Sequence, residues 1–226
     1  MKTIIEPFRI KSVEPIYFTT KEERKTILEQ HKIPFEEKGH QFERLVACDI
    51  IIKSPGIANT SEILQTLTDA GKEIIGEIEW AYRNADGKII GITGSNGKTT
   101  TTGLCHHFLQ AAGMDAAKVG NVGEGFCHFL AENNAAWYVC ELSSFQLEDV
   151  ETFRPRIGIL LNITPDHLDR YEYSLDKYAD AKMRMMRNMT EEDTLIYNAM
   201  DPVTVAKVIG SESEERLWSI RETDLI

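Results

Sequence analysis

The sequence predicts an α/β protein with parallel sheets, in which a small N-terminal unit precedes a larger second unit. Short apolar runs alternate with segments of helical periodicity along most of the chain, which is typical of strands joined by helices. A glycine-rich stretch also follows the apolar run Lys88-Ile89-Ile90 and precedes a helical pattern. Strands joined in this way pair in parallel and are buried on both faces, so this order favours a parallel sheet.

The N-terminal unit is predicted to span residues 1–87, with residues 84–87 as a linker. Its strands are expected at 13–18 and 48–53 and its helices at 21–31, 61–70 and 77–83, with Ser61 as an N-cap and Gly71 as a stop. Such folds usually open with a strand and a glycine loop, and the first ten residues show neither. We therefore expect the usual first βαβ element to be absent from this chain.

A turn of Ser54-Pro55-Gly56 follows the strand expected at 48–53. Open α/β sheets bind ligands at the carboxyl ends of their strands, so the turn is a candidate binding site. A simple loop punctuated by proline and glycine explains the same residues equally well.

The glycine-rich stretch predicts a phosphate-binding loop. Backbone N–H groups of such a loop turn towards an anion, and the following helix adds partial positive charge at its N-terminus. Lys98 can reach the terminal phosphates of a nucleotide, and the Thr99 hydroxyl can meet Mg²⁺. Ile92 stands where the strict pattern has glycine, and the structural alternative is a turn with a surface lysine. The candidate nucleotide-binding residues are Gly94, Ser95, Asn96, Gly97, Lys98, Thr99 and Thr100.

The second unit, residues 88–226, is predicted to be a parallel sheet of the P-loop type. Leu104, Phe108 and Ala111 recur at helical spacing after the loop, and this helix is expected to end near Ala112 with Gly113 as its C-cap. Further strands are expected at 136–140, 157–163, 194–198 and 217–220, and further helices ending near 133 and at 175–187 and 201–209, with a tight turn at 120–123.

Two of these strands deliver titratable side chains at their carboxyl ends. Glu141 follows the strand at 136–140, the position from which nucleotide hydrolases hold Mg²⁺, although it could instead cap the turn at Ser143-Ser144. His167 follows the strand at 157–163 between carboxylates, as a metal ligand, an acid/base group or a solvated loop residue.

Lys182 lies on an apolar helical stripe with Leu175, Tyr178 and Met185. A lysine on a buried stripe is costly unless it is paired, deprotonated or covalently modified, so its inward position indicates a special role. The alternative is that its ammonium group reaches the surface along its own methylenes. The methionines at 183, 185 and 186 are read as core filling.

The composition excludes several classes of function. The formal net charge of −11 argues against general binding to nucleic acid or to an anionic membrane. No apolar run approaches the roughly 20 residues of a membrane span, and Glu6 interrupts the N-terminus where a signal peptide stays apolar. The four cysteines are scattered and are expected to be free thiols, and adjacent Cys105-His106-His107 cannot converge on one metal ion. We expect a cytoplasmic protein.

Four segments, taken together, resemble the Mur ligase family. They are residues 94–99 (GSNGKT), 120–123 (GNVG), 141–148 (ELSSFQLE) and 162–171 (NITPDHLDRY). The resemblance implies an ATP-dependent amide ligase of bacterial peptidoglycan precursor synthesis, expected as a monomer. Such an enzyme phosphorylates the carboxylate of UDP-N-acetylmuramoyl-L-alanine, and the amine of D-glutamate attacks the acyl phosphate. Two Mg²⁺ ions would screen the clustered negative charge.

The resemblance also implies roles for individual residues around ATP and metal. Lys98 would hold the β- and γ-phosphates, Thr99 and Glu141 the first Mg²⁺, and His167 the second. Lys182 matches the carbamylated lysine of the family, and a carbamate would turn a buried cation into an anion that bridges towards Mg²⁺. The catalytic set is therefore Lys98, His167 and Lys182.

The residues implied for the UDP-linked substrate come from both units. Ser54, Pro55 and Gly56 would lie near the diphosphate, and Thr19 and Thr20 near the uracil. Asn121, Ser143 and Gln146 would contact the muramoyl part.

The resemblance leads us to expect that the D-glutamate-binding C-terminal domain and the last part of the ATP domain are missing, so that the chain alone completes no turnover. Thr19 also stands where the family commonly has aspartate. Another Mur-type ligase such as folylpolyglutamate synthase, or another P-loop enzyme such as a kinase, is an alternative. A non-catalytic nucleotide-binding module is a further one.

Overall fold

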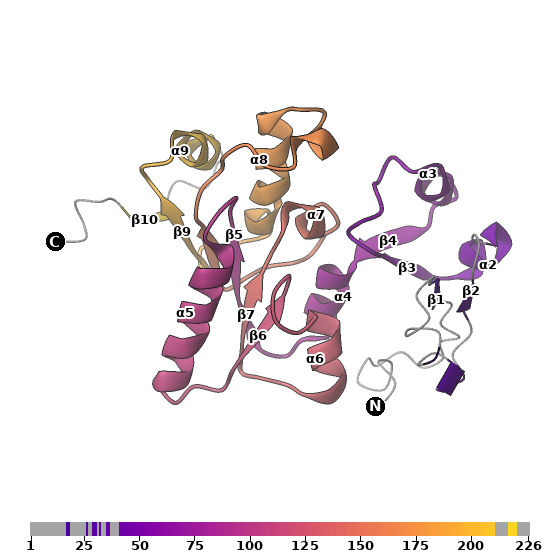
Figure 1. Ribbon diagram of the computed structural model, residues 1–226, viewed down its shortest axis with the longest axis horizontal. Coiled ribbons are helices and arrows are strands. Elements are labelled where there is room, and N and C mark those ends of the chain that lie inside the picture. The colour runs from indigo at the N-terminus through magenta and orange to yellow at the C-terminus, as the bar shows by residue number, and fades with distance from the viewer. Residues whose placement is uncertain are drawn as a thin grey trace.

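The protein is described by a computed structural model that covers residues 17–18, 26, 29–30, 32, 35–36, 41–210 and 217–220. A six-stranded parallel sheet in the order β10-β9-β8-β5-β7-β6 forms the larger part, and a two-stranded parallel sheet β3-β4 lies beside it (Figure 1). The α/β class predicted from the sequence is confirmed. The strands of the large sheet are β5 (Lys88–Thr93), β6 (Ala116–Gly120), β7 (Trp137–Glu141), β8 (Ile157–Leu160), β9 (Thr194–Asn198) and β10 (Leu217–Ile220).

Helices cover both faces of the large sheet. Helix α5 (Lys98–Ala111) packs on one face, where Cys105 and Leu109 contact Ile90, Ile92 and Val139. The other helices pack on the opposite face around a larger core, which contains Tyr138 and Leu195 from the sheet. They are α4 (Glu77–Asn84), α6 (Phe126–Glu132), α7 (Ser144–Leu147), α8 (Leu175–Met183) and α9 (Pro202–Ile209), with the 3-10 turns η1 (Leu168–Tyr171) and η2 (Arg184–Met186).

Local capping explains where several of these helices begin. Ser174 accepts a hydrogen bond from the Lys177 N–H at the start of α8, and Asp201 accepts one from the Thr204 N–H at the start of α9. Pro202 stands at the first position of α9, where its missing N–H costs nothing. The predicted helix at 175–187 therefore begins as expected, but it tightens into η2 after Met183.

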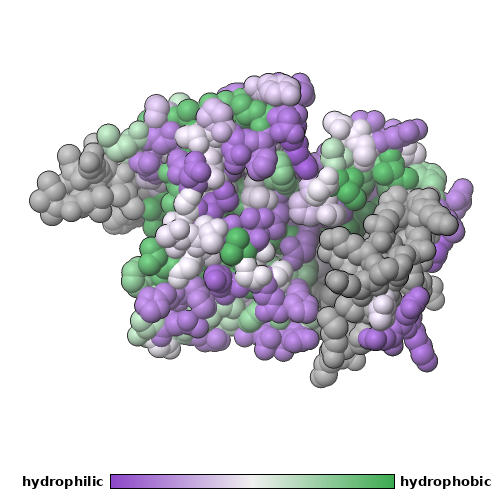
Figure 2. Space-filling model, in the orientation of Figure 1, coloured by the Kyte–Doolittle hydropathy of each residue, from purple (hydrophilic) through white to green (hydrophobic). Residues whose placement is uncertain are grey.

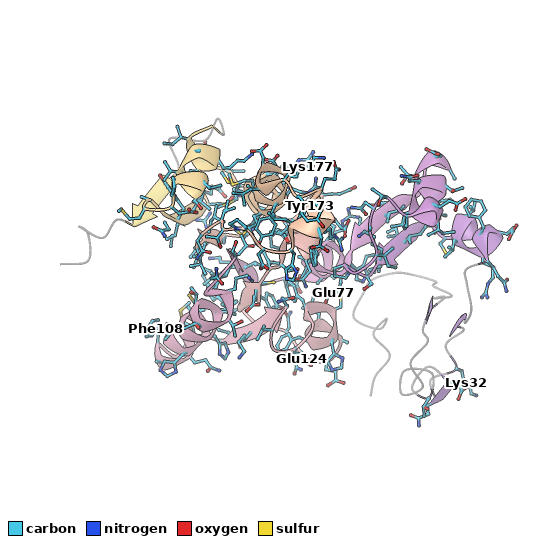
Figure 3. The ribbon with its side chains drawn as sticks, turned by 45° about the horizontal axis from the view of Figure 1, so that its top comes forward. Lys32, Glu77, Phe108, Glu124, Tyr173 and Lys177 are labelled. Atoms are coloured by element: carbon cyan, nitrogen blue, oxygen red, sulfur yellow. The ribbon has the colours of Figure 1, made fainter. Side chains whose placement is uncertain are left out.

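The rotation of α5 differs from the apolar pattern of its sequence. The helix and its stop before Gly113 are confirmed, yet Leu104 and Phe108 are 50% and 64% exposed. Figure 3 shows Phe108 on the outer side of this helix. The helix instead buries Thr102 and packs the partly buried Cys105 and Leu109 against the sheet, because the phosphate loop fixes the direction in which the helix leaves β5.

The N-terminal part contains β1 (Tyr17–Phe18), β2 (Phe35–Glu36), α2 (Phe42–Ala47), β3 (Ile50–Lys53), α3 (Glu62–Asp69) and β4 (Glu73–Gly76). Strand β3 confirms the strand predicted at 48–53, and α3 confirms the helix predicted at 61–70. Strand β4 was missed, because its only apolar signal is the pair Ile74-Ile75. Thr19 and Thr20 lie outside the described residues, as do most of the helix predicted at 21–31 and the start of the strand at 13–18.

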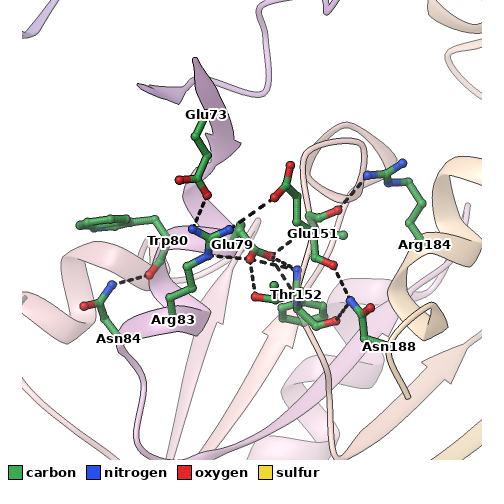
Figure 4. A network of polar contacts seen from close by, with 11 residues as sticks. Glu73, Glu79, Trp80, Arg83, Asn84, Glu151, Thr152, Arg184 and Asn188 are labelled. Carbon is green, nitrogen blue, oxygen red and sulfur yellow. Dashed lines mark hydrogen bonds and ion pairs between the residues drawn. The ribbon is translucent and has the colours of Figure 1, made fainter. Parts of the chain in front are cut away.

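Helix α4 joins the two parts by packing into the large core. Its Ile78 and Ala81 are buried in the same cluster as Tyr138. Glu79 is fully buried and accepts hydrogen bonds from the N–H groups of residues 151–153, at 2.9 to 3.0 Å, and from the Thr152 hydroxyl (Figure 4). The domain boundary at residue 87 stays a prediction. Within the described part of the chain, no helix has the length and apolar character needed to cross a bilayer.

Candidate active site

The candidate residues gather at the carboxyl ends of β5, β7 and β8, which are neighbours in the sheet. The phosphate loop leaves β5 with Gly94 at a φ of 153° and Gly97 at 85°, and the left-handed Gly97 starts α5. A Cβ on Gly94 would lie 2.9 Å from the Cβ of Leu161, so the loop passes close to the backbone segment that follows β8. No side chain caps the start of α5, which leaves its first N–H groups for an anion.

Ser95 and Asn96 bind the segment after β8 in this structure. The Ser95 hydroxyl donates to the carbonyl of Thr164 at 2.8 Å and accepts from the Thr164 N–H at 2.9 Å. The Asn96 N–H donates to the Asn162 side chain at 2.9 Å, which donates back to the Asn96 carbonyl at 3.1 Å. These contacts tie the phosphate loop to the segment that carries His167. Their predicted contacts with nucleotide stay predictions.

Lys98 and Lys182 converge on the phosphate loop from different helices. The Lys98 ammonium group donates to the carbonyls of Gly94 and Ser95, each at 2.8 Å. Lys182 is 1% exposed, donates to the Gly94 carbonyl at 3.0 Å and lies 4.4 Å from the ring centroid of Tyr178. The inward orientation predicted for Lys182 is therefore confirmed, and its ammonium group does not reach the surface.

This environment changes the protonation of Lys182. Burial lowers its pKa from 10.5 to about 7, and the positive charge of Lys98 acts in the same direction, while Asp166 opposes them. A lysine with a pKa near neutrality carries a substantial fraction of free amine at physiological pH. A free amine is nucleophilic, so Lys182 has chemistry that an exposed lysine lacks.

Glu141 ends β7 beside the phosphate loop and is 1% exposed. Its Oε1 accepts a hydrogen bond from the Asn121 side chain at 2.9 Å, whereas its buried Oε2 has no hydrogen-bond partner among the described residues. A buried carboxylate oxygen without a partner is costly unless a cation binds it. The residue therefore fits the divalent metal that its position predicts.

The capping alternative for Glu141 is wrong, because Ser143 caps α7 by itself. The Ser143 hydroxyl accepts from the Gln146 N–H at 3.2 Å, and the Gln146 side chain accepts from the Ser143 N–H at 3.0 Å. This capping box fixes the segment that follows Glu141. The contacts predicted between Ser143 or Gln146 and a substrate stay predictions.

The turn with Asn121 presses against the end of β7. Gly120 has a φ of 103°, and a Cβ there would lie 2.4 Å from the Glu141 carbonyl oxygen. The Asn121 N–H donates to that same carbonyl at 2.9 Å. The turn predicted at 120–123 is thus confirmed, and it holds the Asn121 amide against the Glu141 carboxylate.

His167 lies in the segment bound to the phosphate loop and precedes η1. Its φ is 47°, its side chain is 65% exposed, and its ring centroid is 5.5 Å from that of Phe145. An exposed imidazole at this edge is free to meet a ligand. The roles of His167 as a metal ligand, an acid/base group or a solvated loop residue all stay predictions.

The turn Ser54-Pro55-Gly56 lies against the larger part of the molecule, through contacts that the sequence did not reveal. The Pro55 carbonyl accepts a hydrogen bond from Arg170 at 2.7 Å. Lys53 forms a buried ion pair of 2.6 Å with Asp149 and donates to the Ile57 carbonyl at 2.8 Å. The only sequence signal for this contact is a lysine at the end of an apolar strand. Figure 2 shows a notch where the two parts meet.

Comparison with known protein families matches most of the described chain. Residues 92–224 match the Mur ligase middle domain, and residues 17–63 match the MurD N-terminal domain. The UDP-N-acetylmuramoylalanine–D-glutamate ligase of Bacteroides fragilis is 45% identical over 183 residues, which are 81% of this chain and 41% of the relative. The corresponding ligase of Christiangramia forsetii is 43% identical over 181 residues, with 80% and 41% covered. The chain thus spans about two fifths of the length of these relatives.

Solved structures show the same fold at low sequence identity. The UDP-N-acetylmuramate:L-alanyl-gamma-D-glutamyl-meso-diaminopimelate ligase from Neisseria meningitides has a TM-score of 0.60 at 15% identity, covering 90% of this chain and 68% of that one. The MurF ligase from Thermotoga maritima in complex with ADP has a TM-score of 0.54 at 16% identity, covering 97% and 51%.

Proposed function

This chain belongs to the Mur ligase family, and we propose that it serves an ATP-dependent ligase that adds D-glutamate to UDP-N-acetylmuramoyl-L-alanine in peptidoglycan precursor synthesis. The reaction would pass through an acyl phosphate of the muramoyl substrate, in the bacterial cytoplasm and in a monomeric enzyme. The residues described here would hold ATP, Mg²⁺ and the UDP-linked substrate. The observation that carries the proposal is the buried Oε2 of Glu141, which has no partner among the described residues and lies beside a loop on which two lysines converge.

The residues divide the work by position. Lys98 would exchange the carbonyls of Gly94 and Ser95 for the phosphates of ATP, and the first N–H groups of α5 would complete the cradle. Thr99 and Glu141 would hold one Mg²⁺, and His167 would help to hold a second. Bound Mg²⁺ supplies charge screening for the transferred phosphoryl group. Asn121 would orient the Glu141 carboxylate through its hydrogen bond.

Calorimetry with ADP, with and without Mg²⁺, tests the nucleotide site. We expect Mg²⁺ to tighten ADP binding to the wild-type chain and Glu141→Gln to abolish that gain, because the amide is a poor ligand for a hard cation. Glu132→Gln is the matched control, since Glu132 is exposed on α6. Binding of ADP that ignores both Mg²⁺ and the Glu141 substitution would refute the metal assignment. If the wild-type chain bound neither ADP nor the UDP-linked substrate, it would be a relative of these ligases that does not bind their ligands.

We also propose that Lys182 is carbamylated. Its free amine would attack CO₂, forming a C–N bond and releasing one proton, and the product would be an anion beside Lys98. The support is its burial, its lowered pKa and the adjacent cation. Carbon-13 NMR after incubation with labelled bicarbonate should show a carbamate signal that Lys182→Ala loses and that the exposed-site variant Lys177→Ala keeps. The same signal in Lys182→Ala would refute the assignment.

A further inference from the structure

Arg170 contacts both parts of the molecule at once. Its Nη1 donates to the Pro55 carbonyl at 2.7 Å, and its Nε and Nη2 donate to the two carboxylate oxygens of Glu148 at 3.2 and 2.8 Å. The guanidinium carbon also lies 4.3 Å from the ring centroid of Phe145. A planar group with donors on both edges is suited to such a bridge, and a lysine cannot make the same set of contacts.

The partners of Arg170 lead to the candidate active site. The ring centroid of Phe145 lies 5.5 Å from that of His167, and the Phe145 ring also stacks on that of Tyr171, with the centroids 6.1 Å apart. The Tyr171 hydroxyl donates to Glu148 at 2.6 Å, and its ring meets Tyr178 at 5.3 Å. Tyr178 in turn contacts the Ser95 hydroxyl at 3.2 Å. Arg170 therefore stands between the turn at Pro55 and the phosphate loop.

The bridge is partly shielded from water. The side chains of Arg170 and Glu148 are only 16% and 17% exposed, and Glu148 belongs to the segment that follows Glu141. Partial burial strengthens a bidentate ion pair beyond an exposed one, because water screens it less. The backbone around it is also constrained, since His167 and Glu172 on either side of η1 have φ values of 47° and 54°.

We propose that Arg170 is a positioning residue, which holds the turn Ser54-Pro55-Gly56 and the His167 segment in one fixed relation. A substrate bound at the turn would then present its reacting end to the metal site at a set distance. What the turn binds rests on the proposed function, but the bridge itself does not. The role is mechanical, because Arg170 acts through Pro55, Glu148 and Phe145.

Hydrogen exchange on the whole chain tests the bridge without any ligand. The Ile57 N–H, bonded to the Ser54 carbonyl, reports on the turn, and the Tyr173 N–H, bonded to the Leu168 carbonyl, reports on the His167 segment. We expect Arg170→Lys to accelerate exchange of both amides about tenfold or more and to leave the exchange rate of the Cys140 N–H, in the sheet, unchanged. Arg187→Lys, at an exposed arginine, should match the wild type. Faster exchange of the Tyr173 amide alone, or of neither amide, would overturn the proposal.

Glu148→Gln provides a second variant that keeps Arg170 in place. It should accelerate the same two amides to a smaller extent, and it decides the question if Arg170→Lys also loosens the sheet. A binding measurement separates positioning from simple stability. Arg170→Lys should weaken the binding of UDP-N-acetylmuramoyl-L-alanine about tenfold and change the affinity for Mg·ADP less than about twofold. Unchanged substrate affinity would overturn the positioning role. A wild-type chain that binds neither ligand refutes the proposed function, while the exchange result still decides the bridge.

Discussion

Lys98 and Lys182 share one acceptor, the carbonyl oxygen of Gly94, at 2.8 and 3.0 Å. Two ammonium groups on one oxygen repel each other, and burial removes the water that would otherwise screen them. The pair is therefore an arrangement that negative charge would relieve. A phosphate at Lys98 or a carbamate at Lys182 would each supply it.

The first prediction concerns the pH dependence of stability in bicarbonate-free buffer. The folded pKa of Lys182 is about 7 and the ordinary value is 10.5, so between these pH values the unfolded chain binds more protons than the folded one. The free energy of unfolding should therefore gain a rising contribution from pH 7 towards 10.5, and the burial cost is fully present below pH 7. Urea unfolding of Lys182→Met should lack this rise, whereas Lys177→Met should keep it. Equal slopes in Lys182→Met and wild type would contradict the assignment.

Glu79→Gln should destabilise the protein by about 2–4 kcal/mol, because the amide would point hydrogen atoms at N–H groups that now bind a carboxylate. Burial alone would raise the pKa of Glu79, but hydrogen bonds from Thr152, Glu151 and Arg83 outweigh it and lower the pKa below 4.5. The advantage of wild type over Glu79→Gln should thus be complete above pH 4.5 and shrink as the pH falls below it. Urea unfolding measures both effects, with Glu132→Gln as the exposed control. If the difference in unfolding free energy between wild type and Glu79→Gln stayed constant down to low pH, the predicted role of the Glu79 charge would be wrong.

Two glycine substitutions should change stability in opposite directions. Gly120→Ala meets a positive φ and the Glu141 carbonyl, so it should cost about 3 kcal/mol. Gly103→Ala lies inside α5 in open space and should stabilise by about 0.5–1 kcal/mol. Thermal unfolding of the two variants provides the comparison. A tolerated Gly120→Ala would show that the turn is free to move away from β7.

Ser95→Ala should cost about 1–3 kcal/mol, since it leaves the Thr164 N–H and the Tyr178 hydroxyl without their partner. Tyr178→Phe removes only the second of these contacts and should cost less. The exchange rate of the Tyr173 N–H should rise in Ser95→Ala if the hydroxyl restrains the His167 segment. Equal stability of Ser95→Ala and wild type would show that water replaces these bonds.

The sequence was informative wherever chemistry follows local order. The phosphate loop lies between β5 and α5 as predicted, and the spacing of Tyr178, Lys182 and Met185 identified the buried side of α8 and of the 3-10 turn η2 that continues it. The helix after the loop was found, but its exposed side was not, because the loop and the sheet set its rotation.

Contacts between distant segments could not be predicted. Arg170 contacts Pro55, which lies 115 residues earlier in the chain, and the sequence around neither residue predicts this contact. Lys53 ends an apolar strand and Asp149 lies in a distant segment, so the sequence does not pair them, yet both are buried in one ion pair. The capping box of Ser143 and Gln146, in contrast, has a local sequence signature, S-x-x-Q, which assigns the cap of α7 to Ser143 and not to Glu141.

The hydrogen bonds of Ser95 bear on the order in which the molecule assembles. Its partner Thr164 lies 69 residues further along the chain, so the bond closes a long loop. We expect the phosphate loop to reach its final shape only after β8 has docked beside β5, late in folding. During synthesis on the ribosome, the chain would then become able to bind nucleotide once residue 164 has emerged, and not when the glycine-rich stretch itself emerges.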